Sequence, residues 1–436
     1  MGTRESEFKT LTEVGTLGRG KSKHRPRNDP DLYGGEYPFV QTGDVKRAPF
    51  YLMEYTQTYN AKGLAQSKLW PPGTLCITIA ANIADTAILA IPACFPDSIL
   101  GFMPHPLKAD VRYTKYCLDA FRGHMEQISK GTTQDNLSMD KLLKLRFWFP
   151  AYERQQKIAA LLTAYDDLIA NNQRRIALLE SMAEEIYREW FVRMRFPCYE
   201  DTPKAGGLPV GWTLRRLSDV ATVNANSLRR GAEPEFVAYL DISAVSTNSF
   251  EEPTRMKHQD APGRARRLVR DGDIIWSSVR PGNKTYCLIL DPPDNLVAST
   301  GFAVISPKPD TPFSYLSKAV TTQEFTDQMV AVAKGAAYPA TSFDDFEKAQ
   351  IVWPSPDLLA TFHQRTEPML RQVALLRAQC RALAHQRDTL LPRLISGKLR
   401  VDHLDIQFPP SMQQQQVQQP PAEAAPARAE AVTMSR

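Results

Sequence analysis

The chain has 436 residues, which at roughly 100–200 residues per domain predicts two to four domains. Hydrophobic residues make up 43% and charged residues 23% of the sequence, and no uninterrupted apolar run reaches roughly eighteen residues, so the composition excludes fibrous, membrane-spanning and wholly disordered proteins. The net charge of +5 permits nucleic-acid binding without requiring it, because binding depends on whether lysine and arginine cluster.

The six cysteines give no sign of a disulfide framework or a structural metal. None forms a C-x-x-C pair, and no histidines lie at zinc-ligand spacing from them. The N-terminus lacks the basic region and apolar core of a secretory signal. The sequence therefore favours a reducing cytoplasm.

Near the N-terminus, Gly15 to Ser22 (GTLGRGKS) satisfies the P-loop expression G-x-x-x-x-G-K-S. A P-loop needs a buried strand that ends at the first glycine and a helix that starts at the lysine. Here the half-polar KTLTEV precedes the motif, and KHRPRNDPD with its two prolines follows it. We interpret the motif as a basic glycine-rich loop, with a nucleotide-hydrolysing enzyme kept as an alternative.

Short apolar segments bounded by turn residues predict paired strands at 75–79 and 87–91, followed by a helix at 112–127. The same signals return at 273–277 and 286–290, with a helix at 312–332. These segments lie close to 200 residues apart.

An internal duplication explains this recurrence. Phe39 to Asp44 (FVQTGD) matches Phe236 to Asp241 (FVAYLD), and Gly101-Phe102 matches Gly301-Phe302. Other matches keep the same order along the chain. The sequence predicts two copies of one mixed α/β (α+β) unit.

A long helix is predicted after each copy. Glu153 to Arg193 contains no proline or glycine and carries apolar residues at a heptad period, and the second stretch repeats this period. Pro368 is expected to open or kink the second helix, and Arg387 interrupts its apolar seam. Neither seam can bury its stripe alone, so we expect the two helices to pack on each other as a coiled coil whose core comprises Ile158, Leu162, Tyr165, Ile169, Asn172, Ile176, Leu179, Ile186, Phe362, Met369, Val373, Leu376, Leu383 and Leu390.

Proline, glycine and glutamine mark the remaining boundaries. Three prolines and two glycines indicate a linker between the first helix and the second copy, and a tail rich in Gln, Pro and Ala cannot bury a core. The expected organisation is copy 1 at 1–150, helix 1 at 151–195, linker at 196–209, copy 2 at 210–355, helix 2 at 356–403 and a disordered tail at 404–436.

Catalytic patterns are absent from the sequence. Asp291-Pro292-Pro293-Asp294 approaches the D-P-P-aromatic motif of adenine methyltransferases, but its fourth position lacks the aromatic ring that stacks on a flipped base. The seven histidines are scattered, and no Ser/His/Asp or paired-carboxylate arrangement stands out. We predict no catalytic residue, no metal site and no cofactor in this chain, which alone should neither methylate nor cut DNA.

Basic residues gather in segments that look too rich in glycine and proline to form elements. Such clusters suit phosphate contacts and the bidentate reading of guanine edges by arginine. A solvated charged face explains them equally well from composition, but two like modules can address two half-sites on a duplex. The candidate DNA-binding residues are Arg19, Lys21, Lys23, Arg25, Arg27, Thr132, Thr133, Gln134, Arg264, Arg266, Arg267, Arg280, Asn283, Lys284 and Tyr338.

Several motifs together resemble one known family, the specificity subunits of type I restriction–modification systems. Copy 2 opens with LPVGWTLRRLSDVA (Leu208 to Ala221), and each copy closes with a K-G turn, at Lys130 to Ser138 (KGTTQDNLS) and at Lys334 to Ser342. The helices that begin at Glu153 and end with LLPRLISGKLRV are also similar to the helical regions of this family. The resemblance covers about residues 8 to 403.

The resemblance implies that each copy is a target recognition domain that reads one half of a split site on double-stranded DNA. It further implies that the paired helices form an antiparallel coiled coil, which separates these domains and docks two methylation subunits, with restriction subunits in the full complex. S-adenosylmethionine, ATP and Mg would then bind to the partners, in the cytoplasm of a prokaryote and without a membrane. The rival interpretation is a coiled-coil scaffold that joins two protein-binding modules.

Overall fold

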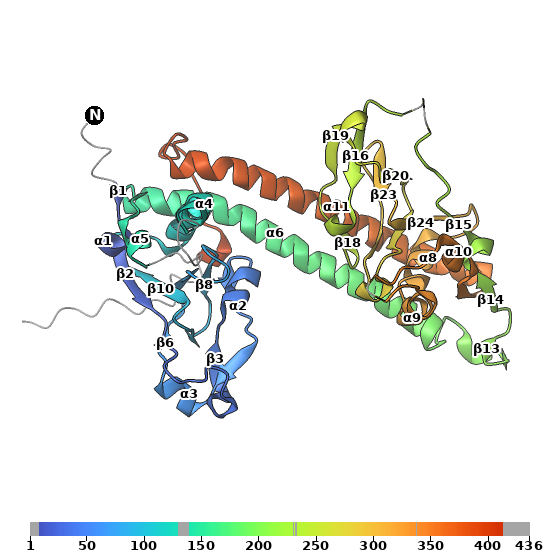
Figure 1. Ribbon diagram of the computed structural model, residues 1–436, viewed down its shortest axis with the longest axis horizontal. Helices are drawn as coiled ribbons and strands as arrows, with labels where there is room; N and C mark the ends of the chain where they lie inside the picture. The colour runs from blue at the N-terminus through green and yellow to red at the C-terminus, as the bar shows by residue number, and fades with distance from the viewer. Residues whose placement is uncertain (1–7, 130–138, 230, 232, 337, 413–436) are drawn as a thin grey trace, which may run out of the picture. The chain divides into compact units, whose positions relative to one another are not determined.

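The structure of the chain is a computed structural model that describes residues 8–129, 139–229, 231, 233–336 and 338–412. It contains two compact units, and each joins one α/β copy to a segment of both long helices (Figure 1). Unit 1 consists of Met1–Ala170 and Ala382–Arg436, and unit 2 consists of Asn171–Arg381. The boundaries between the units therefore fall inside the long helices.

Five strands form the central sheet of unit 1, in the order β2–β10–β7–β8–β4. Neighbours are antiparallel except for β4, which pairs parallel to β8. The two strands predicted around the turn after residue 79 are confirmed as β7 and β8. The strands are β2 (Gly15–Arg19), β4 (Tyr51–Leu52), β7 (Leu75–Thr78), β8 (Thr86–Leu89) and β10 (Ile99–Pro104).

A second sheet of unit 1, here called its distal sheet, has the order β5–β3–β9–β6, and a short pair joins β1 to β11. These strands are β1 (Phe8–Lys9), β3 (Tyr33–Phe39), β5 (Gln57–Tyr59), β6 (Leu69–Trp70), β9 (Ala93–Cys94) and β11 (Phe147–Trp148). The helices are α1 (Leu11–Val14), α2 (Thr42–Arg47), α3 (Ala61–Ala65), α4 (Val111–Ser129) and α5 (Met139–Lys144), with a 3-10 turn at Pro30–Leu32. The helix predicted at 112–127 is confirmed as α4.

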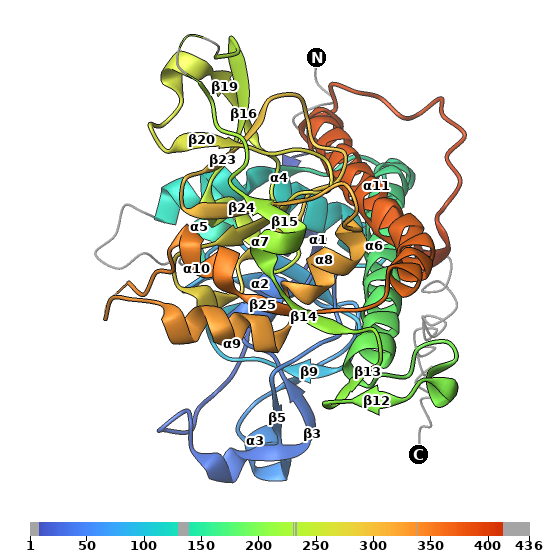
Figure 2. The same cartoon turned by 90° about the vertical axis from the view of Figure 1, so that its right-hand side faces the viewer.

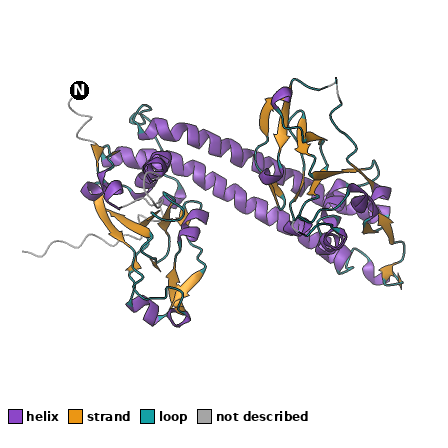
Figure 3. Ribbon diagram, viewed as in Figure 1, coloured by secondary structure: helices purple, strands orange, loops and turns teal. Residues whose placement is uncertain are grey.

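The central sheet of unit 1 is buried on both faces because its side chains alternate between two cores. Leu75 and Ile77 of β7 pack in a cluster with Tyr113 of α4, whereas Cys76 between them packs with Trp70 of the distal sheet. Figure 3 shows α4 and α5 on one side of this sheet and the distal strands on the other. The distal sheet is therefore the part of unit 1 farthest from its helical layer.

Unit 2 repeats this plan. Its central sheet has the order β15–β24–β21–β22, and its distal sheet has the order β19–β16–β23–β20. These strands are β15 (Ala221–Val223), β16 (Phe236–Leu240), β19 (Thr254–Lys257), β20 (Ala265–Leu268), β21 (Ile274–Ser277), β22 (Tyr286–Leu288), β23 (Leu296–Ser299) and β24 (Phe302–Pro307). The remaining strands are β12 (Lys204–Ala205), β13 (Leu208–Pro209), β14 (Thr213–Arg216), β17 (Val245–Ser246), β18 (Ser249–Phe250) and β25 (Gln350–Trp353).

The helices of unit 2 also correspond to those of unit 1. They are α7 (Leu217–Val220), α8 (Phe313–Ala319), α9 (Gln323–Val332) and α10 (Phe343–Lys348). Figure 2 shows the distal strands β16, β19, β20 and β23 on one side of β24 and α8 to α10 on the other. Ile275 faces one core and Trp276 the other, as in unit 1. The matching strand orders confirm the duplication.

The single helix predicted at 312–332 is wrong, because α8 and α9 are separate helices. Helix α8 ends at Ala319, and the Thr322 side chain then accepts a hydrogen bond from the Phe325 amide as the N-cap of α9. A threonine in this extended conformation starts a new helix instead of continuing the old one.

The two long helices are α6 (Tyr152–Tyr187), extended by a π-helical turn at Arg188–Val192, and α11 (Pro356–Ile395). The second helix does not open at Pro368, because α11 begins at Pro356, where proline suits the first helical turn, and runs through Pro368; a kink at Pro368 stays a prediction. None of the predicted seam residues is exposed. In unit 1, Asp166 pairs with Arg387 while Leu162 shares a core cluster with Leu394. In unit 2, Glu180 pairs with Arg377 and the Trp190 ring lies 5.9 Å from that of Phe362, so the helices run antiparallel within each unit.

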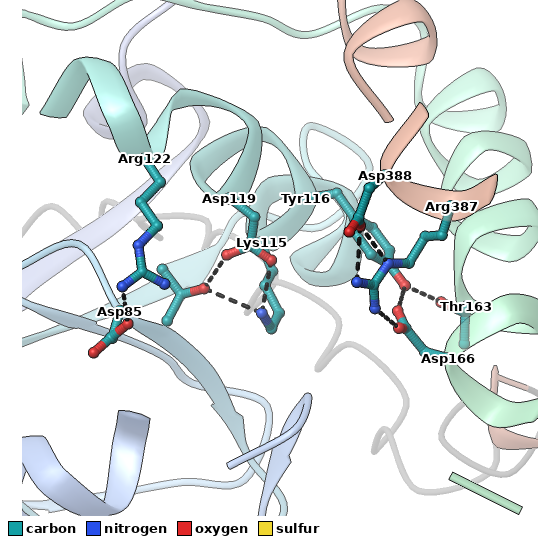
Figure 4. A network of polar contacts seen from close by, with 10 residues as sticks. Asp85, Lys115, Tyr116, Asp119, Arg122, Thr163, Asp166, Arg387 and Asp388 are labelled. Carbon is teal, nitrogen blue, oxygen red and sulfur yellow. Dashed lines mark hydrogen bonds and ion pairs between the residues drawn. The ribbon is translucent and has the colours of Figure 1, made fainter. Parts of the chain in front are cut away.

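Arg387 does not disturb the packing of α11 in unit 1, because it has a carboxylate partner (Figure 4). Its Nη1 lies 2.5 Å from Oδ1 of Asp166 on α6, and the Tyr116 hydroxyl of α4 donates to the other carboxylate oxygen of Asp166 at 2.5 Å. Burial, together with the Asp166 carboxylate, raises the pKa of Tyr116. This network joins α4, α6 and α11 within unit 1.

Residues 404–412, predicted to belong to a disordered tail, pack on unit 1 instead. Met412 is 2% exposed, and the Ser411 hydroxyl donates to Asp167 at 2.6 Å. The apolar residues Ile406 and Phe408 cover the core and account for the order of this segment. The rest of the predicted tail, 413–436, lies outside the described residues.

Candidate nucleic-acid interface

The first basic segment follows β2 and lies against the edge of the distal sheet in unit 1. The Lys21 amide donates to the Phe95 carbonyl at 3.0 Å. The Gln66 Oε1, just before edge strand β6, accepts hydrogen bonds from the amides of Lys23 at 2.6 Å and His24 at 3.0 Å. The chain is thereby fixed along β6, although it forms no regular element from Gly20 to Asp29.

The basic side chains of this segment differ in whether other groups of the protein accept their hydrogen bonds. Arg27 Nη2 donates to both carboxylate oxygens of Asp97 at 2.8 Å, and Arg19 Nε donates to the Asp97 carbonyl at 2.6 Å. Arg25 Nη1 donates to the Ser22 carbonyl at 2.7 Å. Lys21 and Lys23 are exposed, and within the described part of the chain their ammonium groups have no hydrogen bond or ion pair. These two lysines are the most available for phosphate contacts.

The counterpart of this segment in unit 2 follows β15. The Leu228 amide donates to the Arg266 carbonyl at 2.9 Å, which places residues 226–229 along edge strand β20. Arg229 is exposed and was missed by sequence reasoning. The available signal was its spacing, because Arg229 follows Val220 at the same distance as Lys23 follows Val14.

The arginines at 264–267 do not form the loop predicted from their composition. Arg266 and Arg267 belong to β20, which pairs with β23, so β-sheet pairing outweighed the flanking glycine and proline. Arg264 Nη2 lies 2.7 Å from the Asp241 carboxylate, and Arg266 Nε donates to the Gly263 carbonyl at 3.1 Å. Arg267 Nη1 reaches the Ser227 hydroxyl at 3.3 Å.

A second basic group lies at the turn between β21 and β22. The Arg280 guanidinium lies 4.6 Å from the centre of the Tyr338 ring, and its amide donates to the Pro339 carbonyl at 2.7 Å. Tyr338 is 70% exposed, and Asn283 and Lys284 continue the same turn. The structure therefore brings Arg280 and Tyr338 together, from positions far apart in sequence.

This turn is linked to β20 through the start of α10. The Thr341 amide donates to the Ser278 carbonyl at 2.9 Å, and Phe343 lies 4.8 Å from the Arg267 guanidinium. The corresponding turn of unit 1, with the candidates Thr132, Thr133 and Gln134, lies outside the described residues.

The P-loop-like motif has a structural explanation. The predicted glycine-rich loop is wrong for Gly15 to Arg19, which form strand β2. A Cβ atom at Gly15 would lie 2.3 Å from the Phe102 ring, and one at Gly18 would lie 2.8 Å from the Trp70 ring. At Gly20 it would lie 2.2 Å from the Pro96 carbonyl oxygen. The glycines allow close packing against aromatic rings and backbone.

The substitution Gly20→Ala is therefore expected to lower the free energy of unfolding by about 1–3 kcal/mol, because a backbone carbonyl cannot yield as a flexible side chain can. Lys21→Met, which removes the lysine that a P-loop would need, should change it by less than about 0.5 kcal/mol. Denaturant unfolding measures both values. An ATP-dependent rise in melting temperature that Lys21→Met abolishes would contradict this interpretation and support a nucleotide site.

Among the residues that the structure describes, no group of three or more His, Cys, Asp or Glu side chains is placed to hold a metal ion. In the same part of the chain, every helix is too short or too polar to cross a lipid bilayer.

Comparisons with known proteins agree with one another. The family described as "Type I restriction modification DNA specificity domain" matches residues 3–181. The MjaIX specificity subunit of Methanocaldococcus jannaschii is 23% identical over 421 residues, which cover 92% of this chain and 95% of that protein. The HindI specificity subunit of Haemophilus influenzae is 28% identical over 151 residues, 34% of this chain and 32% of that protein.

A solved structure with the same fold is known from another type I system. The crystal structure of the S subunit of a type I restriction–modification system from M. genitalium superposes with a TM-score of 0.60 at 13% sequence identity. The match covers 89% of this chain and 95% of that one. At this identity the likeness concerns the fold alone, with its two β-rich parts and its two long helices packed together.

Proposed function

We infer from these similarities that the chain is a non-catalytic specificity subunit of a type I restriction–modification system, and on this premise we propose that each of its α/β copies reads one half of a split DNA site. One observation carries the proposal: both units place a basic segment along the edge strand of their distal sheet, with Lys23 against β6 and Arg229 beside β20. Two related surfaces with different side chains suit two different half-sites.

The chemistry of these segments fits duplex DNA. Exposed ammonium and guanidinium groups contact phosphates, which fix the position of a protein on the duplex without reading its sequence. Tyr338 adds an exposed ring beside Arg280, and ring and guanidinium together offer a planar surface near the same turn. Acidic residues offset part of the positive charge, as Asp97 does for Arg27 and Asp241 for Arg264.

The partners follow from the same premise. As a specificity subunit the chain acts in a complex with other subunits, and we propose that α6 and α11 dock two methylation subunits, with restriction subunits in the complete assembly. S-adenosylmethionine, ATP and Mg would bind to those partners, since the P-loop expression at Gly15 to Ser22 begins with strand β2 and does not form a phosphate-binding loop. A scaffold that joins two protein-binding modules would have no reason to carry unpaired basic residues along both distal sheets.

Removal of four unpaired charges should flatten the salt dependence of DNA binding. Each phosphate contact contributes about 0.9 to the slope of log affinity against log salt, so alanine at Lys21, Lys23, Arg229 and Lys284 should reduce the slope by up to about 3.6. Fluorescence anisotropy with a duplex that carries the recognised site, titrated at several salt concentrations, gives the slope.

A control variant should lose the same charge at the exposed positions Arg174, Arg175 and Arg393 of the long helices and at Lys398 just after α11, each replaced by alanine. It should keep the slope of the unaltered chain. Equal slopes for all three proteins would mean that the basic segments are only solvated faces.

A further inference from the structure

In the described part of the chain, both units hold buried side-chain nitrogens without a hydrogen-bond acceptor at one edge of the distal sheet. They are Nε2 of Gln66 and Nε1 of Trp70 in unit 1, and Nε of Arg267 in unit 2. A buried donor without an acceptor costs about 1–3 kcal/mol, so its occurrence at a surface where a ligand binds has a functional explanation.

Gln66 and Arg267 lie at the same edge of the duplicated distal sheet. Gln66 lies three residues before β6 and Arg267 lies in β20, and both strands pair with the matching neighbour in the distal sheet, β9 or β23. Each side chain also touches the basic segment that passes along that edge, Gln66 through the amide of Lys23 and Arg267 through the Ser227 hydroxyl. Two copies that differ in sequence thus place an incompletely bonded donor along the same edge.

Arg267 differs from the arginines around it. Arg264 has the Asp241 carboxylate as a partner, whereas Arg267 has no ion pair within the described residues. Its one hydrogen bond, to Ser227, is long at 3.3 Å. The side chain is half-buried, and burial lowers the pKa of Arg267 with no carboxylate to oppose the shift. The folded chain therefore keeps a positive charge partly out of water without a matching negative group.

The guanidinium plane of Arg267 is also held in place. The Phe343 ring lies 4.8 Å from its central carbon, and the residue stands in a strand that is paired on one side with β23 and flanked on the other by residues 226–228. A fixed, planar pair of donors suits the bidentate contact to O6 and N7 of guanine, while the more exposed Arg229 and Arg264 suit phosphates.

We propose that Arg267 is a specificity-determining residue, which donates from its terminal nitrogens to the O6 and N7 atoms of a guanine in the half-site read by unit 2. This inference rests on the proposed function. The guanine would supply acceptors for the terminal nitrogens, and the long bond from Nη1 to Ser227 would be exchanged for them.

Methylation mapping of the complete complex, with the chain and its methylation partners in a host cell, tests the inference. In the Arg267→Lys variant, which keeps the charge and loses the planar pair of donors, the preference for guanine at one position of one half-site should fall by roughly 5- to 150-fold. The other half-site should be unchanged. The matched control is Arg255→Lys on the opposite edge strand β19, where the arginine also lies over a ring, Phe236 at 5.4 Å, and there both half-sites should stay the same.

A second measurement separates reading from folding. The Arg267→Met variant removes the partly buried charge, and its melting temperature should not lie below that of the unaltered chain. A lower melting temperature would assign Arg267 a structural role and overturn the inference, as would a uniform loss of methylation at all sequences, which indicates a phosphate contact.

The remaining outcomes distinguish the inference from its premise. If the unaltered complex methylates no defined sequence, the proposed function fails and the inference fails with it. If the site is defined but the Arg267→Lys variant keeps its full guanine preference, the inference alone fails.

Discussion

Replacement of residues 212–352 by the equivalent segment of a related specificity subunit is expected to change one half of the methylated site completely and to leave the other half unchanged. The segment runs from Trp212 to Val352 and contains both sheets of unit 2, but it leaves α6 and α11 as they are. All basic side chains that we assign to the second half-site lie within it. Methylation mapping in a host that expresses the exchanged chain with its methylation partners gives the result.

The control exchange takes the segment from a relative whose second half-site is the same, and it should leave the whole site unaltered. A change in both halves after the first exchange, or in neither half of an active complex, would contradict the assignment of one half-site to each copy.

The substitution Trp276→Ala should lower the free energy of unfolding by about 3–5 kcal/mol. Trp276 is fully buried in β21, where its ring centre lies 5.4 Å from that of Phe346 and 5.7 Å from that of Tyr286. Its Nε1 donates to the Val320 carbonyl at 3.0 Å, and this acceptor would lose its partner. The cost combines a cavity with a lost buried hydrogen bond.

Denaturant unfolding followed by circular dichroism measures this loss. Leu214→Ala in β14, where the side chain is 59% exposed, serves as the control and should change the free energy by less than about 0.5 kcal/mol. If Trp276→Ala lowered the free energy of unfolding by less than about 1 kcal/mol, the side chains of β21 would not form the core of unit 2.

The central strands could be predicted from the sequence because their signal is local. Residues 75–79 and 273–277 are apolar runs bounded by turn residues, and both became buried strands that face a core on each side. The duplication was equally readable, since matches at Phe39 and Phe236 keep their order along the chain.

Strand β2 could not be predicted, because its glycines look like loop residues until their neighbours are known. The rings of Phe102 and Trp70, far away in sequence, occupy the space beside Gly15 and Gly18. The continuation of α11 through Pro368 could not be predicted for a related reason. The packing of α11 on α6 in unit 2 stabilises the helix beyond what the local sequence indicates.

The candidate interface was predictable in composition but not in detail. Whether an arginine is paired depends on residues remote in the chain, as Arg27 is with Asp97 and Arg387 is with Asp166. Within the described residues, Nε of Arg267 lacks an acceptor because of its place in β20 beside Phe343. No residue spacing in the sequence indicates this arrangement.

The central claim, that the two copies read two halves of one split site, is tested most directly by mapping methylation in a host genome that expresses the unaltered chain with its methylation partners. The account predicts a methylated motif with two specified blocks separated by a gap of fixed length and arbitrary sequence. A single continuous block of specified bases, with no gap, would contradict it.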